Sequence, residues 1–248
     1  MKQVIGFFGG DSQVGTTMIA QSLAEFLAEQ GSKVLLILGS GNYGDAYLRS
    51  NPAHSIDDLK AGIRSGKVDA EELMQSLQQK KTLWILPGVR NPLTAKYFPE
   101  NTYDVLLETG KSRFDYVIID GGWDYQLGIT ISALTYCDSR FFVITQQAKS
   151  LARYGFYQQQ IFGPLGIEGK LIINKYIRDP ALFLKKDILK FCEKNDALQI
   201  PYTEYGWQAE MEGTTLMEYR GFYKAIERLA GEVAPEFVKE RKWKLNFV

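Results

Sequence analysis

The sequence predicts an α/β fold in which a doubly wound, mainly parallel sheet is flanked by helices. Two observations predict it. Short apolar runs recur along the chain without the polar alternation of a sheet that has one face in water, and the stretches between them show helical periodicity. Repeated alternation of strand and helix is typical of such a sheet. The expected strands are residues 4–8, 34–38, 83–86, 116–119, 141–144 and 171–173.

The expected helices follow from apolar residues spaced three and four positions apart, which lie on one face of a helix. The first helix stops at Gly31, because glycine commonly ends helices. The longest loop-like passage, residues 39–52, follows the second expected strand at the carboxyl edge, where such sheets bind ligands. The apolar positions are Ile19, Leu23, Phe26 and Leu27 in the first helix, Leu184, Ile188 and Phe191 in a second, and Phe222, Ile226, Leu229 and Val233 in a third.

The amino-acid composition argues against several classes of protein and of functional site. The 248 residues contain no internal repeat or Pro/Gly/Ser linker, so we expect a single domain over residues 1–248. Equal numbers of basic and acidic residues, 29 each, argue against non-specific binding to nucleic acid. Two cysteines, Cys137 and Cys192, and one histidine, His54, argue against a disulfide scaffold, a zinc site and a Ser-His-Asp triad. With no signal peptide and no apolar stretch of ~20 residues, we expect a cytoplasmic protein.

A glycine-rich turn joins the first expected strand to the first helix. Gly10, Gly15 and Thr17 have the spacing of a P-loop, G-x-x-x-x-G-K-[ST]. Glycines let the backbone N–H groups of such a loop turn inward around phosphate oxygens at the positive end of a helix, and the hydroxyl residue contacts Mg²⁺. The candidate phosphate-binding residues are Gly10, Asp11, Ser12, Gln13, Val14, Gly15, Thr16 and Thr17.

Residues 9–17 resemble the deviant Walker A loop, K-G-G-x-G-K-T, of the MinD/ParA group of P-loop ATPases, and further segments resemble that group in the same order. Residues 114–120, Phe-Asp-Tyr-Val-Ile-Ile-Asp, are similar to its Walker B strand, and residues 141–145 to the strand after it. Residues 171–175, Leu-Ile-Ile-Asn-Lys, resemble the strand whose terminal Asn reads adenine. Residues 200–202 and 209–213 resemble the closing segment, so that the resemblance spans residues 3–234. The Val-Gly-Thr-Thr ending of the loop is most similar to the CpaE/TadZ branch.

The resemblance implies a P-loop NTPase fold of the SIMIBI type that binds ATP or ADP with Mg²⁺. It implies metal contacts from Thr17 and Asp120, and nucleotide contacts from the loop, Asn174 and Pro201. It also implies a nucleotide-dependent homodimer that works with a protein partner to position or assemble a cell-envelope, pilus or secretion machine, at the inner membrane or a cell pole.

Two departures from the family pattern change the expected chemistry. Asp11 stands where the family has its deviant lysine, which reaches the partner's phosphates across the dimer, and Thr16 stands where it has the Walker lysine. Each charge-assisted bond to phosphate contributes roughly 1.5–3 kcal/mol, so losing both costs about 3–6 kcal/mol. Asp11 also brings a negative charge that repels phosphate. Phosphoryl transfer depends on placed positive charge, so we expect at most a weak ATPase.

Several of these residues have a second, structural interpretation. Asp120 would support Mg²⁺ or cap the turn at residues 121–122, Thr17 would contact Mg²⁺ or cap its helix, and Asn174 would bind adenine or simply leave a strand. Lys149 and Lys175 would replace the missing lysines or remain solvated.

The C-terminal tail, residues 235–248, is basic and aromatic. The family uses a short amphipathic C-terminal helix to bind anionic lipid. In this chain Trp243, Leu245 and Phe247 alternate with strand periodicity, so docking on its own domain or on a partner is an equal interpretation.

Three functions follow from these patterns. The first is a degenerate MinD/ParA-like protein that binds nucleotide weakly or not at all and acts as a dimeric scaffold or localisation factor. The second is an active Mg²⁺-dependent ATPase whose positive charge comes from outside the loop. The third is an enzyme of the same fold with another phosphorylated ligand.

Overall fold

One sheet runs through the computed structural model, which describes residues 3–44, 46–49 and 53–237. The described part contains eight strands in the order β3-β4-β2-β5-β1-β6-β7-β8. All neighbouring pairs are parallel except β3 with β4, which are antiparallel. The strands are β1 (Gln3–Gly9), β2 (Val34–Leu38), β3 (Gln78–Lys80), β4 (Leu83–Leu86), β5 (Tyr116–Asp120), β6 (Ser139–Ile144), β7 (Lys170–Tyr176) and β8 (Ala197–Pro201).

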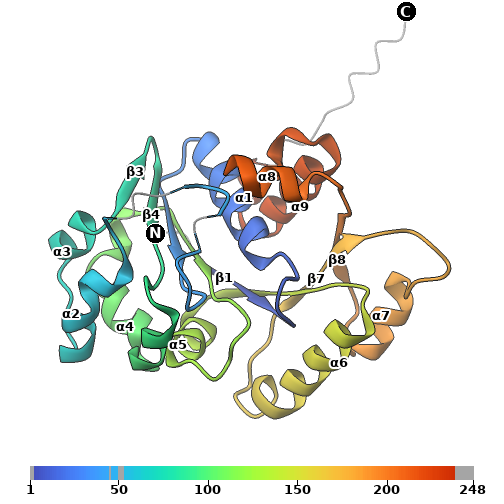
Figure 1. Cartoon of the computed structure of the whole chain (residues 1–248), viewed down its shortest axis with the longest axis horizontal. Coiled ribbons are helices and arrows are strands. Elements are labelled where there is room, and N and C mark those ends of the chain that lie inside the picture. The colour runs from blue at the N-terminus through green and yellow to red at the C-terminus, as the bar shows by residue number, and fades with distance from the viewer. Residues whose placement is uncertain (1–2, 45, 50–52, 238–248) are drawn as a thin grey trace, which may run out of the picture.

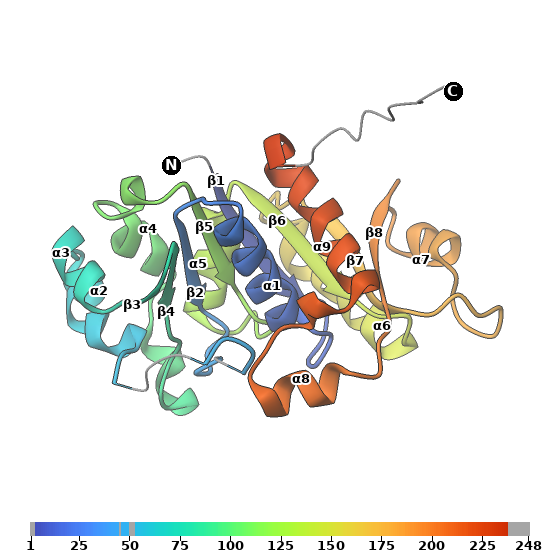
Figure 2. The same cartoon turned by 90° about the horizontal axis from the view of Figure 1, so that it is seen from above.

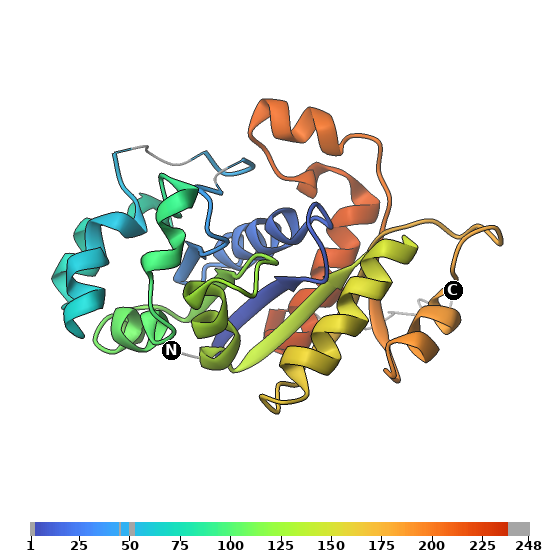
Figure 3. The same ribbon diagram turned by 60° about the horizontal axis from the view of Figure 1, so that its bottom comes forward.

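Helices cover both faces of this sheet (Figure 1). Three of them, α1 (Thr16–Glu29), α8 (Gly206–Glu212) and α9 (Arg220–Val233), lie over one face, and α1 and α9 run side by side there (Figure 2). The opposite face carries α4 (Thr102–Leu107), α5 (Gly128–Tyr136), α6 (Ala148–Tyr157) and α7 (Lys185–Phe191), which come forward in Figure 3. Two short helices, α2 (Lys60–Ser65) and α3 (Ala70–Gln75), flank the edge formed by β3 and β4.

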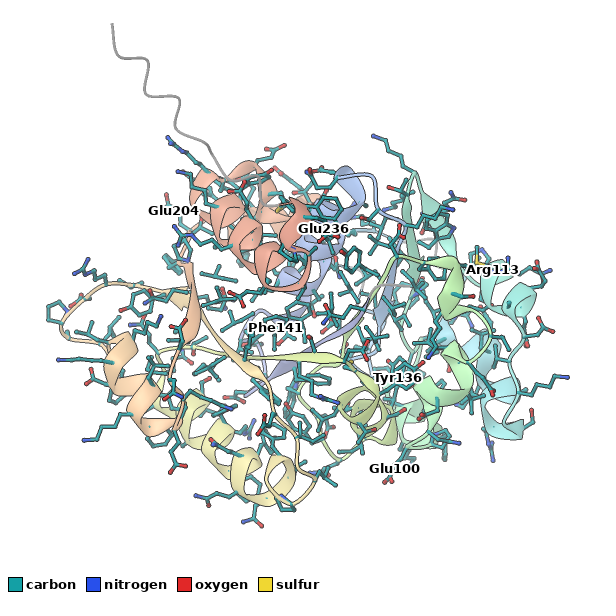
Figure 4. The ribbon with its side chains drawn as sticks, turned by 180° about the vertical axis from the view of Figure 1, so that it is seen from behind. Glu100, Arg113, Tyr136, Phe141, Glu204 and Glu236 are labelled. Carbon is teal, nitrogen blue, oxygen red and sulfur yellow. The ribbon has the colours of Figure 1, made fainter. Side chains whose placement is uncertain are left out.

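The central strands are largely apolar because both faces of the sheet are covered there. In β1, Ile5 and Phe7 pack toward α1 and α9, whereas Val4 and Phe8 pack toward the helices of the other face. The Phe7 ring stacks on Phe141 with ring centroids 5.3 Å apart. Figure 4 shows Phe141 in the middle of the molecule, with Glu100, Arg113 and Glu204 at its rim. The predicted doubly wound, mainly parallel fold is confirmed.

The six predicted strands and three predicted helices are all present, and two strands were missed. β3 has the polar sequence Gln-Gln-Lys and pairs only with β4 at the edge of the sheet, so it carries no apolar signal. β8, Ala-Leu-Gln-Ile-Pro, lies at the opposite edge and is only partly buried. Cys137 and Cys192 are buried free thiols. None of the described helices is long and apolar enough to cross a bilayer.

Gly39, which follows β2, marks a close approach to the buried Tyr103. A Cβ at Gly39 would lie 1.9 Å from the Tyr103 hydroxyl, which is a severe clash in a fully buried place. We expect Gly39→Ala to lower the free energy of unfolding by about 2–3 kcal/mol. Adding Tyr103→Phe removes the clashing oxygen and should recover most of the loss. Chemical denaturation of both single variants and the double variant measures this coupling, and additive effects would contradict it.

Candidate functional site

The first βα turn is fastened to the strands beside it. The backbone N–H of Gly9 donates to the Gly122 carbonyl at 2.7 Å, and that of Gly10 donates to the Val143 carbonyl at 2.8 Å. These bonds connect the end of β1 to the segment that leaves β5 and to the end of β6. The loop at residues 10–15 therefore starts from a fixed point at the carboxyl edge of the sheet.

The loop then leads into α1 with backbone amides that have no acceptor in the described part of the chain. Gln13 and Gly15 have left-handed backbone conformations, with φ of 59° and 91°. A left-handed conformation costs a non-glycine residue about 1–2 kcal/mol, so Gln13 is held there by its surroundings. Within the described residues, the backbone N–H groups of residues 13–17 have no acceptor. Such a row of open amides at the N-terminus of a helix binds anions.

Two side chains from the end of β7 hold this loop in shape. The amide nitrogen of Asn174 donates to the Val14 carbonyl at 2.8 Å, and Lys175 Nζ donates to the Gln13 carbonyl at 3.0 Å. Asn174 is 5% exposed. The structure thus places Asn174, predicted from the family resemblance to read adenine, as a support of the loop, with its side chain also lining the adjoining cavity.

A hydroxyl and a carboxylate meet at the base of the loop. Thr17 Oγ1 donates to Asp120 Oδ2 at 2.6 Å, and Asp120 is fully buried at the end of β5. Its other oxygen, Oδ1, has no hydrogen-bond partner among the described residues. Burial raises the pKa of Asp120 to about 6, although the Thr17 hydroxyl and the Gly122 amide partly offset the rise.

This pair has the chemistry of a Mg²⁺ site. Mg²⁺ prefers hard oxygen ligands and typically takes one or two from the protein, the rest from water and phosphate. A buried carboxylate oxygen without a partner is costly, and a cation near it would offset that cost. The residues present therefore fit a divalent ion, with Thr17 and Asp120 as the groups that would hold it.

Asp11 is paired with two basic side chains rather than left bare. Arg153 Nη1 lies 2.5 Å from Asp11 Oδ1, and Lys149 Nζ lies 3.6 Å from Oδ2. Burial raises the pKa of Asp11, but the Ser12 backbone N–H, the Arg153 guanidinium and the Lys149 charge together bring it below its usual value. The Arg153 guanidinium also lies over the Trp123 ring, 5.4 Å from its centroid. The loop start thus carries a net positive cluster with an acid at its centre.

A cavity of about 610 Å³ opens from the loop toward α8 and α9. Its volume is within the range of about 300–1,000 Å³ that is typical of small-molecule sites. Loop residues form one end, and Tyr47, Pro201, Trp207 and Phe222 line the remainder. The arrangement suits a ligand with a phosphate at one end and a flat apolar group at the other.

Comparison with solved structures decides the fold. The chain superposes on a ParA family ATPase from Chlorobium tepidum TLS with a TM-score of 0.76 and 21% identity, over 93% of this chain and 99% of the other. It superposes on MinD from Pyrococcus horikoshii OT3, solved with Mg-ADP, with a TM-score of 0.76, 18% identity and coverages of 95% and 99%. The corresponding values for the MinC:MinD complex of Aquifex aeolicus are 0.71, 19%, 92% and 96%. This chain has the MinD/ParA fold.

The sequence itself matches no protein-family model and no curated protein. Identities near 20% establish the MinD/ParA fold alone. On that fold, sequence reasoning located the loop, Thr17 and Asp120, which the structure brings together. It also noted Lys149 and Lys175, and both contact the loop residues.

Arg153, Trp123 and Tyr47 were missed as site residues. Arg153 carries one signal in the sequence, because it lies four residues after Lys149 on the same helix, and residues four apart share a helix face. Nothing in the sequence connects that face of α6 to Asp11, which lies 142 positions away in the chain.

Proposed function

We propose that this chain is a MinD/ParA-like nucleotide-binding protein with a degenerate P-loop, closest to the CpaE/TadZ branch, that acts as a dimeric scaffold or localisation factor for a cell-envelope, pilus or secretion assembly. One observation carries the nucleotide-binding part of the proposal. The Thr17–Asp120 hydrogen bond of 2.6 Å lies at the base of a loop whose amides at residues 13–17 are open within the described chain. Amides for phosphate and oxygens for Mg²⁺ are thus side by side.

The missing lysines lower the expected affinity without removing the binding surface. Backbone amides and the dipole of α1 attract phosphate whatever the side chains are. Thr16, at the position of the Walker lysine, offers no positive charge, so binding depends on these amides, on Mg²⁺ and on the neighbouring basic residues. We expect ADP or ATP to bind with Mg²⁺, weakly for this fold.

Calorimetric titration tests this function. Full-length protein is titrated with ADP and with ATP, each with Mg²⁺ and with EDTA. We expect binding that weakens at least about tenfold when Mg²⁺ is removed, since Mg²⁺ neutralises phosphate charge beside a buried carboxylate. Thermal-shift measurement on the same samples is the control for folding. Failure to bind either nucleotide at millimolar concentration would reject the nucleotide-binding function.

The scaffold part rests on the fold and on the weak expected catalysis. MinD was solved in complex with MinC in one of the structures above, so this fold serves protein assembly. We propose that this chain likewise forms a homodimer, binds a protein partner, and resides in the cytoplasm or peripherally at the inner membrane or a cell pole. Of the tail proposed as a membrane contact, residues 235–237 form a short 3-10 helix, and residues 238–248 lie outside the described residues. Light scattering with and without Mg-nucleotide tests the dimer, and a deletion strain with normal appendages, secretion and polarity would argue against the assembly role.

A working ATPase is the second candidate, and one observation favours it. Lys149, Arg153 and Lys175 all approach the loop, through Asp11 and the Gln13 carbonyl, so positive charge is available from outside the P-loop. This candidate requires Mg²⁺-dependent phosphate release that disappears in Asp120→Ala. Absence of turnover above background, for the protein alone and with its partner, would exclude it.

A further inference from the structure

The loop contains an anion of its own. Asp11 is 4% exposed, and both of its carboxylate oxygens are engaged. Oδ1 accepts from the Ser12 backbone N–H at 2.7 Å and from Arg153 at 2.5 Å, while Oδ2 faces Lys149 at 3.6 Å. An amide, a guanidinium and an ammonium are the groups that proteins use to bind a phosphate. Here the Asp11 carboxylate contacts all three of these groups.

The cluster is built into the fold rather than formed by loose surface chains. Arg153 lies between the Asp11 carboxylate and the Trp123 ring, so it is held from two sides. Its side chain is 36% exposed, compared with 70% for Lys149. Trp123 lines the same cavity as the loop. Arg153 is therefore the firmly placed member of the pair, and Lys149 adds charge at the rim.

The strand register shows where along a bound nucleotide this cluster would lie. Phe7 of β1 pairs with Asp120 of β5, and further outward the Gly9 N–H donates to the Gly122 carbonyl. The start of the loop thus lies beside Asp120, and Thr17, the other member of the metal pair, lies among the open amides at the start of α1. A Mg²⁺ held by Thr17 and Asp120 would neutralise charge on the outer phosphates of a triphosphate. With the inner phosphates on the amides and the base toward Trp207 and Phe222, a third phosphate would point toward Asp11.

We propose that Asp11 is a specificity-determining residue that makes this loop select nucleoside diphosphates over triphosphates, because its carboxylate occupies the cations that a third phosphate would need. This inference rests on the proposed nucleotide-binding function. A diphosphate fits on the amides and the metal pair without approaching Asp11. A triphosphate places an additional negative charge against a buried carboxylate that already engages Arg153, the firmly placed cation of the cluster.

Four proteins test the proposal by calorimetry with Mg-ADP and Mg-ATP. They are the wild type, Asp11→Asn, the double variant Asp11→Asn/Arg153→Gln, and Asp196→Asn as the matched control. Asp196 also forms an ion pair, with Lys185 at 2.5 Å, but it lies just before β8, at the amino edge of the sheet. The control therefore removes the same charge away from the loop.

The wild type should bind Mg-ADP at least about tenfold more tightly than Mg-ATP, the size of effect that one unfavourable charge contact produces. Asp11→Asn should raise Mg-ATP affinity at least about tenfold and change Mg-ADP affinity less than about threefold, because it frees Arg153 for the third phosphate. Adding Arg153→Gln should reverse most of that gain. Asp196→Asn should behave as wild type.

Equal wild-type affinity for the two nucleotides would overturn the inference and leave the proposed function intact. Equal gains for both nucleotides in Asp11→Asn would also overturn it, since Asp11 would then act as a general repulsive charge. If neither nucleotide binds the wild type or Asp11→Asn, the proposed function fails together with the inference. The wild-type comparison needs no variant, so the test holds even where Asp11→Asn unfolds.

Discussion

Replacing Gly15 with alanine is expected to weaken Mg-ADP binding about tenfold to a hundredfold, the loss that follows when one or two amide–phosphate bonds are misplaced. Gly15 has φ of 91° and caps the start of α1. A Cβ there would lie 2.3 Å from the amide nitrogen of Asn174, which is the group that holds the Val14 carbonyl. The clash acts directly on the contact that shapes the loop, so the amides must move.

Gly31→Ala is the matched control for this variant. Gly31 follows the other end of the same helix with φ of 88°, and a Cβ there would meet nothing within 4 Å. Both variants therefore share the cost of an alanine in a left-handed conformation, about 1 kcal/mol. Only Gly15→Ala should change nucleotide affinity, measured by calorimetry. Comparable losses in the two variants would mean that the contact with Asn174 does not shape the binding site.

Asp120→Asn is expected to remove the Mg²⁺ dependence of nucleotide binding while making the ligand-free protein more stable at neutral pH. Burial raises the pKa of this carboxyl from 3.8 to about 6, so the fold favours the protonated form. That contribution to stability is fully present below about pH 4 and is lost as the pH rises through 6. A shift of this size corresponds to roughly 3 kcal/mol.

The asparagine variant has no such penalty, because its side chain stays neutral. At pH 7.5 we expect its free energy of unfolding to exceed the wild-type value by about 1–3 kcal/mol, and at pH 3.5 the two should be nearly equal. Chemical denaturation across this range measures the difference, and calorimetry with and without Mg²⁺ measures the functional loss. A variant that still binds Mg-ADP more tightly than ADP alone would show that Asp120 does not hold the metal.

The sequence was most informative where one segment determines its own structure. Uninterrupted apolar runs such as residues 34–38 form strands because both faces of the sheet are covered. The spacing from Gly10 to Thr17 marked the loop because a backbone cup needs glycines at fixed positions. β3 was not predicted because its residues are polar and give no apolar pattern. It forms an edge strand that is stabilised by antiparallel pairing with β4.

The pairing of charged side chains around the loop could not be predicted from local sequence patterns. From the sequence, Asp11 is predicted only to repel phosphate. In the structure it also forms an ion pair with Arg153 of α6, which lies 142 positions away in the chain. The sequence leaves Asn174 as either an adenine contact or a residue leaving a strand, and it does not indicate that the side-chain amide donates to a carbonyl 160 positions earlier in the chain. Such pairings depend on the assembled topology, which no spacing within one segment encodes.

The two braces from β7 have a consequence for how the loop would meet its ligand. Asn174 and Lys175 donate hydrogen bonds to the carbonyls of Val14 and Gln13. The conformation of the loop backbone therefore does not depend on a bound phosphate. Binding to such a preorganised loop costs little conformational entropy of the chain. The encounter rate and the charge around the loop, rather than ordering of the loop, would then determine the affinity. Substituting the side chains around the loop would change the affinity without changing the backbone conformation.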